Sequence, residues 1–115
     1  MITLRNIVDK LDLDVKAGKS SIDKPIKGGY ASDLLSDVMA NSKAGSIWIT
    51  LQVHQNIVAV ATLKELPVIV LVNGREPDKD TIEKAEEEGI SIASSSLPAF
   101  ELIGKMYEMG ISKVD

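Results

Sequence analysis

The one histidine of the chain, His54, is the side chain best suited to proton transfer near neutral pH. It lies in the segment Val53-His54-Gln55-Asn56, between the end of a predicted strand and the start of a predicted helix. Ligands of open parallel α/β sheets bind at such places, close to helix N-termini. General-base catalysis would also need an orienting carboxylate and a nucleophile, and the sequence places neither beside this histidine. His54 is therefore a candidate ligand contact, with local hydrogen bonding as the alternative.

Two further strand ends carry small polar residues, which gives three such turns in all. Each turn joins a strand to a helix whose first N–H groups can bind an anion or a nucleotide phosphate. The alternative is that the serines and asparagines cap helices and that the glycine only forms a turn. The candidate ligand-binding residues are His54, Gln55, Asn56, Asn73, Gly74, Ser94, Ser95 and Ser96.

The segment Ala17-Gly18-Lys19-Ser20 matches the end of a phosphate-binding P-loop. The complete motif needs a glycine five positions before Gly18, where this chain has Leu13. It also needs a helix directly after the Lys-Ser pair, whereas Ser21 to Lys27 is polar and contains a proline. We therefore interpret the segment as an ordinary turn.

Two groups of charged residues can each be interpreted either as solvent-exposed surface or as a binding site. The acidic stretch from Asp78 to Glu88 is typical of a solvated helix face, and a metal site is the sharper alternative. Four lysines lie close together in the first quarter of the chain and predict a solvated loop, with binding of an acidic partner or a phosphate as the alternative. They are Lys16, Lys19, Lys24 and Lys27.

Composition excludes several classes of protein. The 115 residues suffice for one domain with its own core. Cysteine is absent, which excludes disulfides, thiolate metal sites and a cysteine nucleophile. A net charge of −4 and an aromatic content of 3% disfavour nucleic-acid binding. The longest apolar run, 66–72, is too short to span a membrane, so we expect a cytoplasmic protein without membrane contact.

The hydrophobic pattern predicts an α/β protein. After Gly45, apolar strands at 47–51, 68–72 and 90–93 alternate with helices at 57–65, about 78–88 and 97–109, an order that requires a largely parallel sheet covered on both faces. The front part adds a helix capped by Thr3, a strand near 11–15 and a helix capped by Ser32, while Gly28-Gly29 is predicted to interrupt the chain. We expect a three-layer α/β/α sandwich.

Single residues predict where several of these helices begin and end. Asp33 is placed in the first turn of the helix after Ser32, Asn56 is a predicted cap, and Asp80 and Glu83 have the spacing of a capping box. Gly89 is the predicted helix end, and Pro98 is placed in the first turn of the last helix.

The helix predicted at 57–65 is apolar nearly all round. Such a helix is buried on more than one side or packs against a partner. A small domain with this feature is expected to complete its burial in a symmetric dimer.

Four stretches together resemble the DRTGG domain family: Gly28 to Asn41, Trp48 to Ala61, Asn73 to Pro77, and Glu88 to Ser96. That family is similar to the N-terminal domain of HPr kinase/phosphorylase and also occurs in phosphotransacetylases and CBS-domain pyrophosphatases. The resemblance extends from about Gly28 to Gly110 and more weakly over 1–27. The family's Gly-Asp-Arg segment would fall near His54-Gln55-Asn56, and of its Thr-Gly-Gly segment only Gly74 matches.

The resemblance implies one DRTGG-like domain over 1–115 with the fold of the HPr kinase N-terminal domain. It implies a regulatory or assembly role without catalysis or cofactor, because the catalytic residues of the kinase lie in a separate domain. We therefore expect a non-catalytic, self-associating regulatory domain, with a protein partner or a small anionic ligand. The alternatives are a sensor of nucleotides or phosphorylated metabolites at the strand ends and, third, a small phosphotransferase that uses His54.

Overall fold

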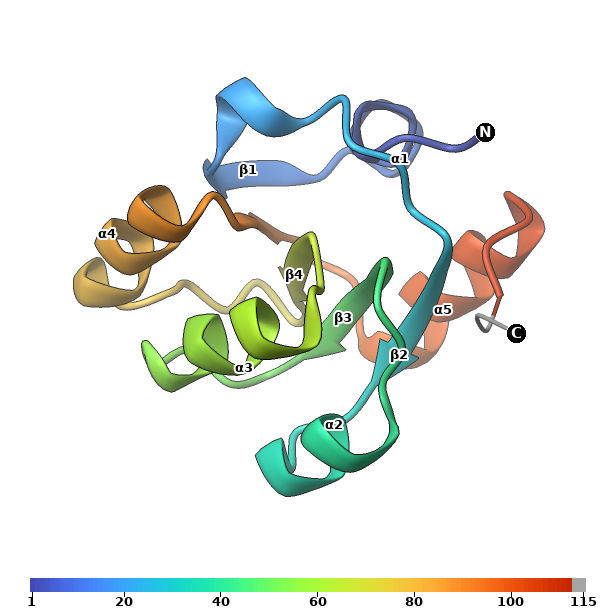
Figure 1. Ribbon diagram of the computed structural model, residues 1–115. Coiled ribbons are helices and arrows are strands. Elements are labelled where there is room, and N and C mark those ends of the chain that lie inside the picture. Colours follow the sequence, from blue (N-terminus) through green and yellow to red (C-terminus); the bar gives the residue numbers. More distant parts are fainter. Residues whose placement is uncertain (113–115) are drawn as a thin grey trace.

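A computed structural model describes residues 1–112 (Figure 1). The helices are α1 (Leu4–Leu11), α2 (Leu35–Asn41), α3 (Asn56–Lys64), α4 (Lys79–Glu88) and α5 (Ala99–Glu108), with a short 3-10 helix at Lys19–Ser21. The strands are β1 (Asp14–Ala17), β2 (Gly28–Ala31), β3 (Ser46–Thr50), β4 (Val68–Leu71) and β5 (Ser91–Ser94). None of the helices in 1–112 is long and apolar enough to cross a membrane.

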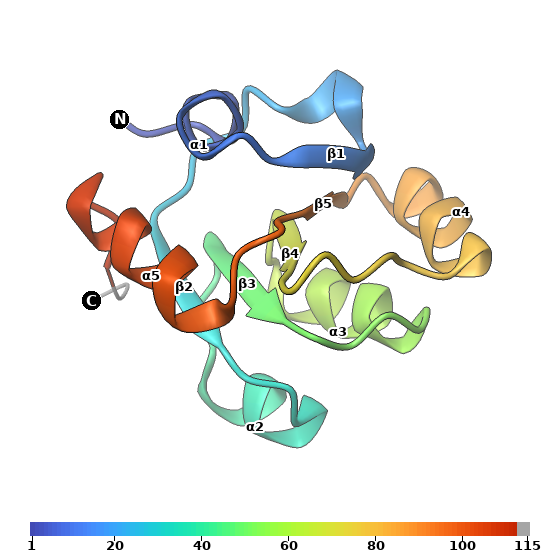
Figure 2. The same cartoon turned by 180° about the vertical axis from the view of Figure 1, so that it is seen from behind.

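The five strands form one sheet in the order β1-β5-β4-β3-β2. Strands β2 to β5 are parallel, and β1 pairs with β5 in the antiparallel direction, with an irregular register between Val15 and Ala17. Helices α2, α3 and α4 cover one face, while α1 and α5 cover the other (Figures 1 and 2). The predicted three-layer α/β/α sandwich with a largely parallel sheet is therefore confirmed.

Each face of the sheet contributes to its own apolar core, because side chains alternate along the strands. Trp48 of β3 is fully buried against α2 and α3, and its indole Nε1–H donates to the Ser32 carbonyl over 2.9 Å. The neighbouring Ile47 and Ile49 point to the α1 and α5 side. Burial on both faces explains why β3 and β4 are almost continuously apolar.

Strand β2 corrects one prediction. Gly28 and Gly29 were expected to interrupt the chain, yet they form the first half of an edge strand parallel to β3. Glycine has a low strand propensity, but here backbone pairing holds the strand in place. Gly29 aligns with Ile47 of β3 and also donates its N–H to the Ser112 carbonyl.

Several predicted element ends are also wrong by a few residues. The first strand starts at Asp14 and not near Leu11, because Asp12 takes a left-handed conformation that ends α1. Ser32 does not cap α2, which begins at Leu35, and Asp33 lies outside its first turn. The Asp33 carboxylate instead accepts hydrogen bonds from the Thr50 hydroxyl and the Leu51 N–H.

The later helices begin differently from the predicted caps. Asn56 is the first residue of α3 and does not cap it, and the predicted capping box of Asp80 and Glu83 is absent because Asp78 occupies the N-cap position of α4. Pro98 precedes α5 and is not in its first turn. The predictions of a Thr3 cap and of a stop at Gly89 are confirmed.

Helix α3 is apolar nearly all round, but not all of its faces are buried. Ile57, Val58, Val60 and Ala61 are buried, whereas Leu63 is 72% exposed. Burial of one broad face thus accounts for most of the apolar residues of α3.

The segment around Gly18 is a turn, as predicted. Gly18 has a φ of 72°, a short 3-10 helix follows it, and its N–H donates to the Glu86 carboxylate. A P-loop would need this N–H free for phosphate, so the P-loop alternative is excluded.

The four lysines do not form one solvated loop. Lys16 pairs with Asp14 and Glu76, and these hydrogen bonds raise the pKa of Lys16. Lys24 donates to the carbonyls of Pro67 and Gly89. At least two of the four lysines therefore have specific structural partners.

Candidate functional site

The carboxyl ends of the parallel strands meet at one edge of the sheet, which we call the carboxyl edge. The turns after β4 and β5 are joined there by backbone hydrogen bonds. The Asn73 N–H donates to the Leu97 carbonyl over 2.9 Å, and the Gly74 N–H donates to the Ser95 carbonyl over 2.7 Å. The structure thus brings together two of the three predicted turns.

The third turn is joined to the start of α4. His54 is 69% exposed, and its Nδ1 lies 2.6 Å from the Asp78 Oδ2. The Val53 carbonyl accepts hydrogen bonds from the Asp78 N–H and the Thr81 hydroxyl. His54 therefore has the orienting carboxylate that sequence reasoning did not find, because the two residues are 24 positions apart.

The predicted site residues divide into exposed and structural groups. Ser94 and Ser95 are buried. The Ser94 hydroxyl donates to the Arg75 carbonyl, and the Ser95 hydroxyl oxygen accepts the Leu97 N–H. The exposed members are His54, Gln55, Asn56, Asn73, Gly74 and Ser96. Only this exposed group presents its atoms directly to solvent at the carboxyl edge.

Helices α2 to α5 all begin at the carboxyl edge, because each follows a parallel strand, and none has a side-chain cap. The last three follow the predicted turns. The N-cap residues are Gln55 for α3, Asp78 for α4 and Pro98 for α5. Asp78 has the residue type and extended backbone of an ordinary cap, but its carboxylate pairs with His54. In α3 the Ile57 and Val58 N–H groups donate to the carbonyls of His54 and Gln55. The first N–H groups of α4 and α5 have no side-chain acceptor and can bind water or an anion.

The charges at this edge are mixed. Arg75 is exposed in the turn after β4 and is the only cationic residue in the strand-end segments 52–56, 73–76 and 94–96. Glu76 is paired with Lys16, and the carboxylate of Asp33 is held by Thr50 and Leu51. We add Arg75 to the candidate site. Sequence reasoning missed it as a site residue, although its charge is a visible signal.

A wider hollow of about 420 Å³ lies beside this edge, between α1 and α5. Lys10, Asp12, Lys105 and Glu108 line it, together with Leu97 from the turn after β5. Its residues come from opposite ends of the chain, so the sequence gives no signal for it. Within 1–112, no group of three or more histidine and acidic side chains is arranged to hold a metal ion.

The comparisons with known proteins support the fold. No family model matches the chain, and no curated protein matches it either. Among solved structures, the chain is similar to the CBS and DRTGG domains of the regulatory region of Clostridium perfringens pyrophosphatase, a structure in complex with the activator diadenosine tetraphosphate. The TM-score is 0.69 and the identity 18%, over 89% of this chain and 44% of the other. This chain thus has a fold found in a regulatory region and spans less than half of that structure.

Proposed function

We propose that residues 1–115 form a DRTGG-like regulatory domain, similar to the N-terminal domain of HPr kinase/phosphorylase. We further propose that this protein acts in the cytoplasm. In this proposal the domain self-associates and binds a small anionic ligand, of the class of nucleotides or phosphorylated metabolites, at the carboxyl edge. Its role is non-catalytic, and the ligand changes the stability or the partner binding of the domain.

The observation that carries this proposal is the uncapped start of α4 and α5 at one edge of the sheet. Unsatisfied N–H groups at helix N-termini favour anions. The exposed side chains of His54, Asn73, Arg75 and Ser96 surround them with further hydrogen-bond donors. The likeness to a regulatory region crystallised with a dinucleotide polyphosphate supports the ligand class.

A phosphotransferase role for His54 is the weaker candidate. An exposed histidine oriented by Asp78 could accept a phosphoryl group on its other ring nitrogen. Within 1–112, however, Asp78 is the only hydrogen-bond partner of the imidazole, and no hydroxyl nucleophile is hydrogen-bonded to the ring. Phosphohistidine formed in the presence of a phosphoryl donor, and lost in His54→Ala, would favour catalysis over sensing.

Thermal unfolding with a panel of anions tests the sensing function. The panel contains ATP, AMP, diadenosine tetraphosphate and inorganic phosphate. A ligand present at a hundred times its Kd raises the free energy of unfolding by about 2.7 kcal/mol. We expect at least one nucleotide to stabilise the protein. Absence of any shift across the panel at millimolar concentration would contradict anion sensing.

The location of binding is tested with a matched pair of variants. Arg75→Ala removes a cation at the carboxyl edge, whereas Lys43→Ala removes an exposed cation from the turn before β3, at the opposite edge. The stabilising shift should shrink in Arg75→Ala and persist in Lys43→Ala. Equal loss in both variants would indicate a general charge effect instead of a site.

A further inference from the structure

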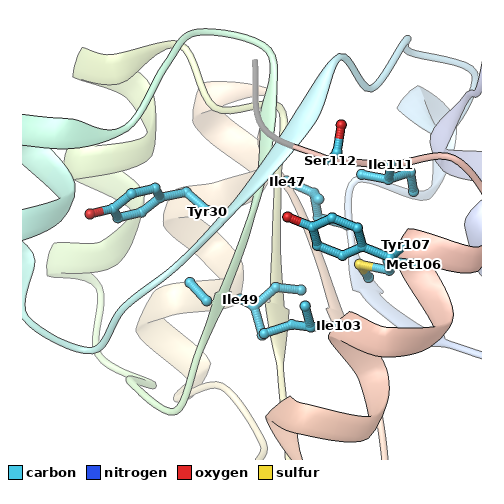
Figure 3. A pocket seen from close by; sticks show the side chains of 10 residues that line it. Tyr30, Ile47, Ile49, Ile103, Met106, Tyr107, Ile111 and Ser112 are labelled. Atoms are coloured by element: carbon cyan, nitrogen blue, oxygen red, sulfur yellow. The ribbon is translucent and has the colours of Figure 1, made fainter. Parts of the chain in front are cut away.

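An apolar cavity lies between α5 and the edge strand β2, and none of the residues that line it is a candidate residue of the carboxyl edge (Figure 3). Its volume is about 170 Å³. Three residues of β2 line it: Gly29 and Ala31, whose side chains are absent or small, and Tyr30, whose ring points away from the cavity (Figure 3). Ile47 and Ile49 of β3 form the inner wall. The cavity exists because β2 fills too little of the space under α5, and it lies at the last strand of the sheet.

Helix α5 carries two exposed aromatic side chains, one of which lines this cavity. Phe100 is 91% exposed, Tyr107 is 61% exposed, and Gly104 between them is exposed as well. The spacing of i, i+4 and i+7 places these residues on one stripe of the helix. Tyr107 also lines the cavity, so the stripe and the cavity form one continuous surface.

This surface carries no charge. None of the 10 residues that line the cavity is charged. On α5, the exposed Glu101, Lys105 and Glu108 border the stripe on the side away from the cavity-lining Ile103 and Met106, because successive residues are rotated by about 100°. A surface that meets its own copy about a two-fold axis must be self-complementary. An uncharged surface meets this condition without like-charge repulsion.

The stripe also has the symmetry that a two-fold contact requires. When two copies of α5 cross in antiparallel orientation near Gly104, Phe100 of each copy faces Tyr107 of the other. Gly104 lets the two helices approach closely, since a Cβ at this position meets nothing within 4 Å in its own chain. An apolar cavity of about 150 Å³ can bind benzene, so the cavity beside Tyr107 has room for one phenyl ring.

We propose that two copies of the chain associate through α5, each seating its Phe100 ring in the partner's cavity between α5 and β2. This inference rests on the self-association in the proposed function and names its surface. It does not depend on ligand binding at the carboxyl edge.

Sedimentation equilibrium of the wild type and of single variants tests the surface. We expect a dimer whose Kd rises about tenfold to a hundredfold in Phe100→Ala, the loss typical of a central aromatic contact. Ala31→Leu fills the cavity from within the chain and should weaken the dimer while leaving Phe100 intact. Leu63→Ala is the matched control, because it removes a similarly exposed apolar side chain from α3, on the other face of the sheet.

Crosslinking gives an independent test, because the chain has no cysteine of its own. Gly104→Cys should form a disulfide-linked dimer on oxidation, since a disulfide requires Cα atoms within about 7 Å of each other. Leu63→Cys should remain uncrosslinked under the same conditions.

The possible outcomes distinguish an error in the proposed α5 surface from an error in the proposal that the chain self-associates. A wild type that stays monomeric at millimolar concentration overturns both. A dimer that is unchanged by Phe100→Ala and Ala31→Leu, and that crosslinks through Leu63→Cys, keeps self-association and overturns the α5 surface.

Discussion

The two edges of the parallel sheet are built in opposite ways. At the amino edge, where β4 and β5 begin, the Lys24 ammonium donates to the carbonyls of Pro67 and Gly89 over 3.0 and 2.9 Å. Gly18 packs there against Ser91, so closely that an added Cβ would lie 2.6 Å from the Ser91 Oγ. At the carboxyl edge, four helices start without side-chain caps, and a Cβ added to Gly74 would meet no atom within 4 Å.

This contrast indicates a division of labour within one sheet. At the amino edge, polar groups form hydrogen bonds with other groups of the protein, and these bonds stabilise the fold. The carboxyl edge leaves donors and exposed side chains for solvent or a ligand. Substitutions at the amino edge should therefore change stability, while those at the carboxyl edge should change binding.

The largest expected effect is at Gly18. Gly18→Ala forces a Cβ against the backbone of Ser91 at a φ of 72°, so steric overlap adds to the backbone strain. We expect a loss of about 3 kcal/mol in the free energy of unfolding, measured by urea denaturation.

Gly74→Ala is the matched control, since Gly74 also has a positive φ of 66° but has open space around it. It should lose only about 1 kcal/mol, the cost of the left-handed conformation alone. Equal losses at the two glycines would contradict the proposed difference between the edges.

The next effect is at Lys24, which joins the starts of two strands. Lys24→Met keeps the apolar stem but leaves the Pro67 and Gly89 carbonyls without this donor, so we expect a loss of about 2 kcal/mol. Lys19→Met, at an exposed lysine of the 3-10 helix, should change stability by less than about 0.5 kcal/mol.

The same lysine predicts a dependence on pH. Burial lowers the pKa of Lys24 in the folded protein, while the unfolded chain keeps the usual lysine pKa of about 10.4. Between these two values the unfolded state binds more protons, so the contribution of Lys24 to stability rises with pH. The difference in stability between the wild type and Lys24→Met should therefore grow towards pH 10, and a constant difference would contradict the burial of this ammonium.

The same edges show how far sequence reasoning reaches. The strands after Gly45 were predicted because runs such as 68–72 are apolar and β-branched, a local signal that burial on both faces produces. Strand β2 was missed because Gly28 and Gly29 have no side chains to give such a signal, and only pairing with β3 makes them a strand.

The predictions of helix caps were wrong for a different reason. Asp33 and Asp78 are typical cap residues, but Thr50 and His54, distant in sequence, bind their carboxylates. Long-range competition of this kind leaves no local pattern. The turns of the candidate site could thus be predicted from their positions after strands, whereas the His54–Asp78 contact and the uncapped helices could not.

A smaller effect on stability is expected at the uncapped start of α5. Pro98 has a φ of −65° and a ψ of 158°, which is the extended conformation of a side-chain cap. Pro98→Ser can cap the helix and Pro98→Ala cannot, so the serine variant should be more stable by about 1 kcal/mol.

Ligand binding should respond in the opposite direction. The serine oxygen would occupy an N–H group that the proposed anion needs, so the ligand-induced stabilisation should be smaller in Pro98→Ser than in Pro98→Ala. Equal ligand shifts in the two variants would place the anion away from the start of α5.

The smallest expected effect on stability is at His54. His54→Ala removes an exposed pair worth at most about 1 kcal/mol and frees the Asp78 carboxylate to cap α4, a gain of similar size. The free energy of unfolding should therefore change by no more than about 0.5 kcal/mol.

A double-mutant cycle tests whether the Asp78 carboxylate exchanges its pairing with His54 for capping of α4. Asp78→Ala should cost about as much in the His54→Ala background as in the wild type, because it removes the cap in the first case and the ion pair in the second. A larger cost in the wild type would mean that the His54–Asp78 pair stabilises the fold, which would make this part of the carboxyl edge resemble the amino edge.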